Sequence, residues 1–160
     1  MRTTTWICDC CGDEIKDASH GWVEWLTKND DGKRSSRGLR LVHHFVHSPR
    51  EGQNKCQYDG NFEYKKDDYA LSDTDLKSFL GPGGLMHLLS MLFDDEAPKD
   101  EIVEIIKRLH IPGYENARSH FATAISDGAF EPNTKPGFYN MRDIEATLAW
   151  VKENVHGALP

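Results

Sequence analysis

The stretch Trp6-Ile7-Cys8-Asp9-Cys10-Cys11-Gly12 decides how the first third of this chain is expected to fold. It must be read together with Val42-His43-His44 and with Cys56, the only cysteine outside the stretch. Crowded cysteines in a reducing compartment favour metal ligation over disulfides. The two-residue separation of Cys8 and Cys11 is typical of a metal-binding knuckle, and Gly12 lets the backbone turn tightly behind it.

Four ligands for a tetrahedral zinc ion can be collected from these segments. Cys8 and Cys11 supply one pair, Cys56 supplies a third ligand, and one histidine of the His43-His44 pair supplies the fourth. A closed set of four ligands predicts a structural zinc ion, because catalytic zinc keeps an open position. The sequence therefore predicts a structural Cys3His zinc site.

The choice among the histidines depends on strand alternation. His43 shares a strand face with Leu39 and Leu41, so it points inward if those leucines face the core. His43 is therefore favoured slightly as the ligand, His44 is the close alternative, and His47 comes third. The remaining thiol, Cys10, is interpreted as a spare cysteine.

A β-hairpin is expected between the two halves of the site. Residues 21–27 are rich in aromatic and β-branched residues and predict one strand, and residues 39–46 predict the returning strand. The segment 29–32 is a strong turn signal, and the polar residues 33–37 are expected to lengthen the loop. The hairpin should thus carry a long basic tip that contacts a partner through Lys33, Arg34, Arg37 and Arg40.

These features resemble zinc-ribbon and treble-clef fingers: a Cys-x-x-Cys-Gly knuckle, a β-hairpin and a distal His/Cys pair. The resemblance covers residues 6–58, and it departs from the usual pattern because the distal pair is not a tight two-residue knuckle. It implies a module that binds nucleic acid or protein.

From residue 72 onward the sequence predicts helices. Ser72 can cap a first helix that stops before Gly81, and apolar stripes predict further helices from about 85, from 98 and over 114–126. A last helix begins near Asn140. The expected fold is α+β, with a zinc-binding β-finger domain at 1–71 and an α-helical domain at 72–160. The helical part is expected to form a homodimer or to dock a second protein.

Charge and hydropathy limit the classes of function. The net charge of −7 makes the chain a poor non-specific binder of nucleic acid, although residues 28–55 carry seven Lys and Arg against three Asp and Glu. No apolar run is long enough to cross a bilayer, and the N-terminus has no apolar signal core. A cytoplasmic protein without a membrane partner is expected.

Parts of the sequence are compatible with two other functions. His43-His44 followed by Asn54 and Cys56 resembles part of an HNH-type nuclease, which would use one of these histidines as a general base. That family also needs a metal-binding histidine soon after this segment, but the next histidine after Cys56 is His87. The nuclease is therefore the alternative, and a non-enzymatic binding or regulatory module is the main prediction.

A DNA-binding helix-turn-helix over residues 98–126 is disfavoured because residues 98–160 hold seven basic and nine acidic side chains.

Overall fold

The computed structural model describes residues 5–132 and 135–155 of the chain. These residues form two compact units, one over 5–110 and the other over 111–155, which are described separately. Residues 72–110, which the sequence predicts to belong to the helical domain, pack with the β-strands of the first unit. Small antiparallel sheets and helices together confirm the α+β class.

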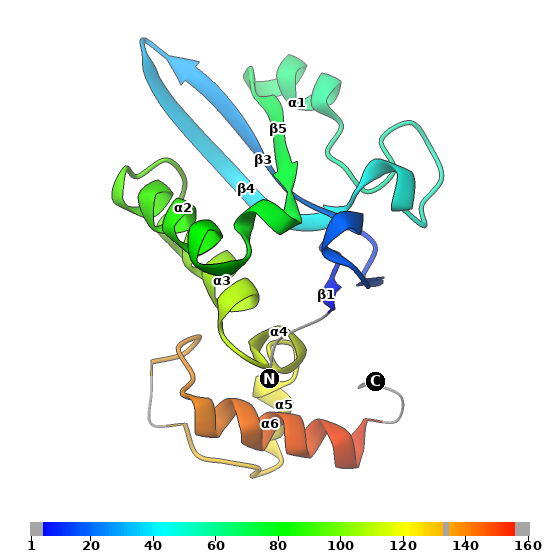
Figure 1. Cartoon of the computed structure of the whole chain (residues 1–160), viewed down its shortest axis with the longest axis vertical. Coiled ribbons are helices and arrows are strands. Elements are labelled where there is room, and N and C mark those ends of the chain that lie inside the picture. The colour runs from blue at the N-terminus through cyan, green and yellow to red at the C-terminus, as the bar shows by residue number, and fades with distance from the viewer. Residues whose placement is uncertain (1–4, 133–134, 156–160) are drawn as a thin grey trace. The chain divides into compact units, whose positions relative to one another are not determined.

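The first unit contains a three-stranded antiparallel sheet in the order β4-β3-β5 (Figure 1). Strand β3 (Gly21–Asp30) and strand β4 (Lys33–His43) form the expected hairpin. The prediction of a long loop at the tip was wrong, because residues 33–37 pair with β3 and only Asp31 and Gly32 form the turn. Both turn residues have positive φ, which the Asp-Gly sequence accommodates.

A β-bulge bends β4 in the middle of this hairpin. The register passes from Glu24 opposite Arg40 to Leu26 opposite Arg37, so β4 contains one extra residue. Gly38 lies in the bulge with a φ of +71°, and a Cβ there would lie 2.7 Å from the hydroxyl of Tyr58. Glycine therefore meets both requirements of the position, the left-handed backbone and the close approach of a side chain.

Acidic side chains close the outer edge of β4. Its backbone N–H groups at Leu39 and Leu41 donate to the carboxylates of Glu101 (2.9 Å) and Asp9 (2.7 Å), respectively. The Asp9 N–H also donates to the Leu41 carbonyl at 2.8 Å. The backbone N–H groups of β4 at these positions are therefore hydrogen-bonded to the knuckle and to a later helix. They are not available to pair with a strand of a second chain.

The predicted helix after Ser72 is wrong. The structure has strand β5 (Ala70–Asp75), which pairs with β3 from Trp22 to Thr27, followed by the 3-10 helix η3 (Leu76–Phe79). Strand β5 is an edge strand made mostly of polar residues, so its apolar and polar residues do not alternate clearly. Its aspartates also resemble the acidic first turn of a helix. Helix α1 (Gly60–Asp67) precedes β5 in the chain.

Helices α2 (Gly81–Phe93) and α3 (Lys99–His110) pack with the sheet to form the main core. Helix α2 begins four residues earlier than expected, because Pro82 is compatible with the first turn of a helix. Gly84 is buried where a Cβ would overlap the backbone of Phe79. The core side chains come from both layers: Val23, Trp25, Leu39, Leu41, Leu76, Phe79, Leu88, Met91, Ile102 and Ile105.

The second unit consists of helices α4 (Tyr114–Ala117), α5 (Phe121–Ser126) and α6 (Met141–Asn154). The single helix expected over 114–126 is interrupted at residues 118–120. A small core of Tyr114, Ala117, Phe121 and Ile144 holds the unit together. The two prolines and the glycine of residues 129–139 predict a small hairpin or an ordered loop, of which residues 133–134 lie outside the described residues. Among the described residues, no helix has the length and apolar character that crossing a membrane requires.

Candidate metal centre

The Cys8-Cys11 knuckle is a tight turn between two short paired strands. Strands β1 (Trp6–Ile7) and β2 (Glu14–Ile15) pair on either side of it. The turn is closed by hydrogen bonds from the Gly12 N–H to the Cys8 carbonyl and from the Cys8 N–H to the Asp13 carbonyl, both 2.9 Å. Gly12 has a φ of +80°, as expected for the glycine behind a knuckle.

Four side chains from three segments converge at this knuckle. The thiols of Cys8, Cys11 and Cys56 and a ring nitrogen of His43 all lie within 4.8 Å of one another. The Nδ1 atom of His43 is 3.5 Å from the Cys11 sulfur and 3.9 Å from the Cys56 sulfur. A tetrahedral zinc ion with ordinary bond lengths separates its sulfur and nitrogen ligands by about 3.5 Å and its sulfur ligands by about 3.8 Å. The donor set and its spacing fit a metal ion.

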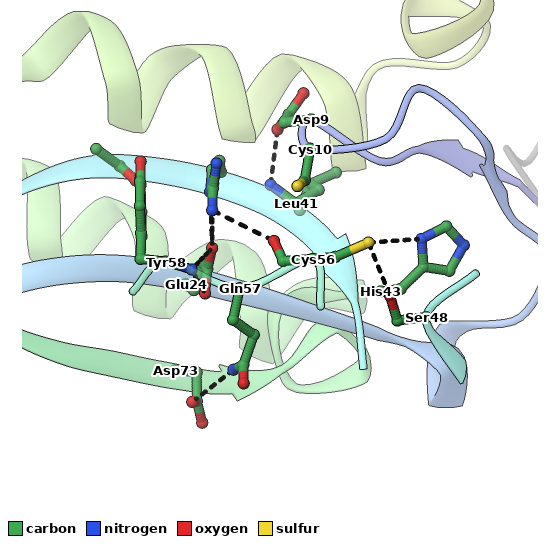
Figure 2. A network of polar contacts seen from close by, with 12 residues as sticks. Asp9, Cys10, Glu24, Leu41, His43, Ser48, Cys56, Gln57, Tyr58 and Asp73 are labelled. Atoms are coloured by element: carbon green, nitrogen blue, oxygen red, sulfur yellow. Dashed lines mark hydrogen bonds and ion pairs between the residues drawn. The ribbon is translucent and has the colours of Figure 1, made fainter. Parts of the chain in front are cut away.

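The orientation of His43 is fixed by a second hydrogen-bonding partner. Its Nε2 atom lies 3.1 Å from the carbonyl oxygen of Glu14 (Figure 2 shows the ring beside Cys56). A carbonyl can only accept, so Nε2 carries the proton and Nδ1 presents its lone pair to the three thiols. Metal-bound histidines typically have such an outer partner, which holds the ring and sets its tautomer.

The other two candidate histidines lie outside the cluster. The Nδ1 atom of His44 accepts the N–H of Val46 as the N-cap of the 3-10 helix η2 (Phe45–His47), and its ring contacts Trp22. The expected strand at 45–46 is therefore wrong. The ring of His47 stacks on that of His20 with centroids 3.8 Å apart. Adjacent residues 43 and 44 thus point to different surroundings.

Burial of the thiols opposes their ionisation when no cation is bound. Burial raises the pKa of Cys11 to about 12, and the neighbouring Cys8 adds to this shift. Burial also raises the pKa of Cys56, although the Ser48 hydroxyl, which donates to its sulfur at 3.0 Å, acts in the opposite direction. A divalent cation reverses this situation because it binds thiolates. The cluster is therefore chemically suited to a metal rather than to free thiolates.

Cys10 lies beside the cluster with a different partner. The Arg50 guanidinium donates to its sulfur at 3.0 Å, and this bond raises the pKa of Arg50. Cys10 is partly exposed and is not among the four grouped ligands, in agreement with its interpretation as a spare thiol.

A buried ion pair ties the knuckle to helix α3. Arg108, only 2% exposed, contacts the Asp9 carboxylate at 2.6 Å and donates to the Ile7 carbonyl at 2.8 Å. The same oxygen of Asp9 accepts the Leu41 N–H (Figure 2). Asp9 lies between Cys8 and Cys11, so one carboxylate links this candidate metal-binding knuckle to the sheet and to α3.

A second network connects Cys56 to the hairpin. Glu24 is fully buried and contacts the Arg40 guanidinium at 2.6 Å and the Tyr58 N–H at 3.2 Å. Arg40 also donates to the Cys56 carbonyl at 3.3 Å and stacks on the Tyr58 ring. Burial raises the pKa of Glu24, while Arg40 opposes that shift. Because Arg40 pairs with its charge, Glu24 can hold the segment that carries Cys56, the last of the four candidate ligands.

The four basic residues expected to contact a partner have different surroundings. Arg40 takes part in the network with Glu24, and Arg37 contacts Asp67 at 3.2 Å and stacks on Tyr69. Lys33 and Arg34 are exposed at the end of the hairpin.

Sequence reasoning missed Asp9, Arg108 and Glu24. The first two are 99 positions apart, and nothing in the pattern of α3 marks Arg108 as buried. Glu24 did carry a signal, since it stands between apolar residues in Trp22-Val23-Glu24-Trp25-Leu26, where a lone charge needs a buried partner.

No protein-family model, curated protein or solved structure matches this chain. The resemblance to zinc-ribbon and treble-clef fingers is thus supported at the level of the Cys3His cluster, which is compatible with a zinc site, and no finger family is recognised.

Proposed function

We propose that this chain is a zinc-stabilised, non-enzymatic binding module, with zinc held by Cys8, Cys11, His43 and Cys56. The observation that carries the proposal is the convergence of these four donor atoms within 4.8 Å. Three thiolates and one imidazole form a soft ligand set that suits zinc, and four protein ligands close its coordination shell. Zinc then acts structurally, by holding the knuckle, the end of β4 and the 44–57 loop together.

The hairpin formed by β3 and β4 is the proposed contact with a partner. Strand β5 pairs with β3 only as far as Thr27, so the end of the hairpin extends beyond the third strand. That end exposes Lys33 and Arg34, while Arg40 is occupied by a buried carboxylate. Two or three cations give a small phosphate footprint on an acidic chain, which disfavours nucleic acid. A protein with an acidic surface is the favoured partner.

The experiment compares three probes against the zinc-loaded protein by fluorescence polarisation: an acidic polypeptide such as poly-glutamate, a 20-mer DNA duplex and a single-stranded RNA of the same length. We expect the polypeptide to bind in a salt-dependent manner and to lose affinity for the Lys33→Glu/Arg34→Glu variant. The matched control, Lys65→Glu/Lys66→Glu on α1, keeps the same net charge and should bind as the parent does. Binding of nucleic acid alone, or equal loss in both variants, would refute the proposed contact.

The nuclease predicted as the alternative is not favoured by any specific contact. His43 belongs to the closed ligand set, and His44 caps η2. Plasmid incubated with the protein and either Mg²⁺ or Zn²⁺ is expected to remain supercoiled. Nicking that is lost in the His44→Gln variant would contradict the non-enzymatic assignment.

A further inference from the structure

Helix α2 presents an apolar face that the rest of the first unit leaves exposed. Met86, Leu89 and Phe93 are 67%, 43% and 87% exposed, and their spacing places them on one side of the helix. Single exposed apolar residues are ordinary, whereas a row of them along one helix marks an interaction surface. The opposite side of α2, with Leu88 and Met91, already packs in the core.

The surroundings of this face make it unlike a solvated surface. No Asp, Glu, Lys or Arg occurs between Lys77 and Asp94. The same side of the helix also carries the exposed small residues Gly83, before Met86, and Ser90, between Leu89 and Phe93. Small residues beside large ones allow a second helix to approach closely and to interdigitate. The face, which comprises Pro82, Gly83, Met86, Leu89, Ser90 and Phe93, is therefore shaped for a helix.

The two ends of α2 are electrostatically complementary to each other. The N-terminal end has no side-chain cap, so the positive pole of the helix dipole lacks an acidic partner from its own side chains. The C-terminal end is followed at once by Asp94, Asp95 and Glu96. An antiparallel second copy brings the acids of each chain to the N-terminal end of the other. A parallel arrangement would place like ends together.

We propose that α2 forms an antiparallel, two-fold symmetric contact with α2 of a second copy of this chain. With the axis beside Leu89, Met86 contacts the partner's Phe93, and Leu89 packs over the partner's Ser90. This register leaves Asp95 next to the first turn of the partner's α2. Sulfur–aromatic contact, large-on-small packing and helix-dipole pairing all occur twice, because the interface is the same on both copies.

The exposed area sets the expected strength of the dimer. The three large side chains expose on the order of 400 Å² of apolar surface per copy, or about 800 Å² in a pair. That is below the 1,200 Å² or so buried in stable complexes, so we expect a dissociation constant of roughly 10–100 µM. The protein should be a monomer at low concentration and a dimer at high concentration.

The test is sedimentation velocity on the zinc-loaded full chain from about 5 to 500 µM, a range that brackets the expected constant. The weight-average mass should rise toward twice that of the monomer. Phe93→Glu should weaken dimerisation by at least about tenfold, because it buries a charge opposite an apolar side chain. The control Phe62→Glu, at an exposed phenylalanine on α1, should have no effect. Far-ultraviolet circular dichroism and zinc content check that both variants are folded.

The orientation is tested by disulfide formation in a Cys10→Ser background. Chains carrying Met86→Cys should cross-link to chains carrying Phe93→Cys, whereas Met86→Cys chains alone should not. A monomer at every concentration, a dimer insensitive to Phe93→Glu, or efficient cross-linking of Met86→Cys to itself would overturn the proposal. Equal weakening by Phe62→Glu would also overturn it.

Discussion

Loss of the Arg108 guanidinium should destabilise the first unit by about 3 kcal/mol. Arg108→Met keeps much of the side-chain volume and removes the contacts with the Asp9 carboxylate (2.6 Å) and the Ile7 carbonyl (2.8 Å). Two hydrogen bonds involving charged groups contribute roughly 1.5–3 kcal/mol each. The Asp9 side chain is 22% exposed, so water recovers part of that loss, which places the estimate at the lower end.

The assay is urea unfolding of the zinc-loaded protein, followed by tryptophan fluorescence and compared at constant m-value. Lys99→Met, on the same helix, loses only a surface ion pair and should change the free energy of unfolding by less than about 0.5 kcal/mol. Combining Arg108→Met with Asp9→Asn should cost at least about 1 kcal/mol less than the sum of the single changes. Strict additivity, or a cost for Arg108→Met no greater than that of Lys99→Met, would refute the reasoning.

Two further predictions concern the bulge and the protons of the site. Gly38→Ala should lower the free energy of unfolding by about 2 kcal/mol in urea, since it adds backbone strain and displaces the Tyr58 hydroxyl; Gly32→Ala has open space around it and should cost about 1 kcal/mol from strain alone. Because burial raises the pKa of Cys11 and Cys56, both are neutral thiols near pH 7, and zinc must displace their protons. Calorimetry in buffers of different ionisation enthalpy should report release of at least two protons per zinc ion, and the apparent zinc affinity should rise about a hundredfold per pH unit from pH 7 to 8. Release of fewer than one proton, or an affinity that falls as the pH rises, would contradict the thiolate ligation.

The hairpin and the Cys3His cluster could be predicted from the sequence because both depend on local signals. Aromatic and β-branched residues alternate in β3, Asp31-Gly32 is a strong turn, and the Cys-x-x-Cys-Gly spacing is short-range. Alternation along β4 also favoured His43, which the structure places with the three thiols. The predicted domain boundary after residue 71 stays a prediction, although the helices that follow pack on the sheet.

Other features depend on tertiary contacts that no local pattern reports. Strand β5 was read as a helix start because its acids suit a helix N-terminus, and only pairing with β3 makes it a strand. The burial of Arg108 follows from a carboxylate 99 positions away, and Arg40 was expected at the surface because its partner Glu24 was not identified. The packing of a strand or helix against distant residues outweighs its own propensity in each case.

We propose that a divalent ion bound by one histidine and three cysteines holds the first unit together. The most direct test of this proposal is the zinc content of the purified protein, measured by inductively coupled plasma mass spectrometry for the parent and for His43→Gln and His44→Gln. We predict one zinc ion per chain in the parent and in His44→Gln, and a large loss of zinc in His43→Gln. A folded parent protein without metal, or loss of zinc from His44→Gln alone, would contradict the account.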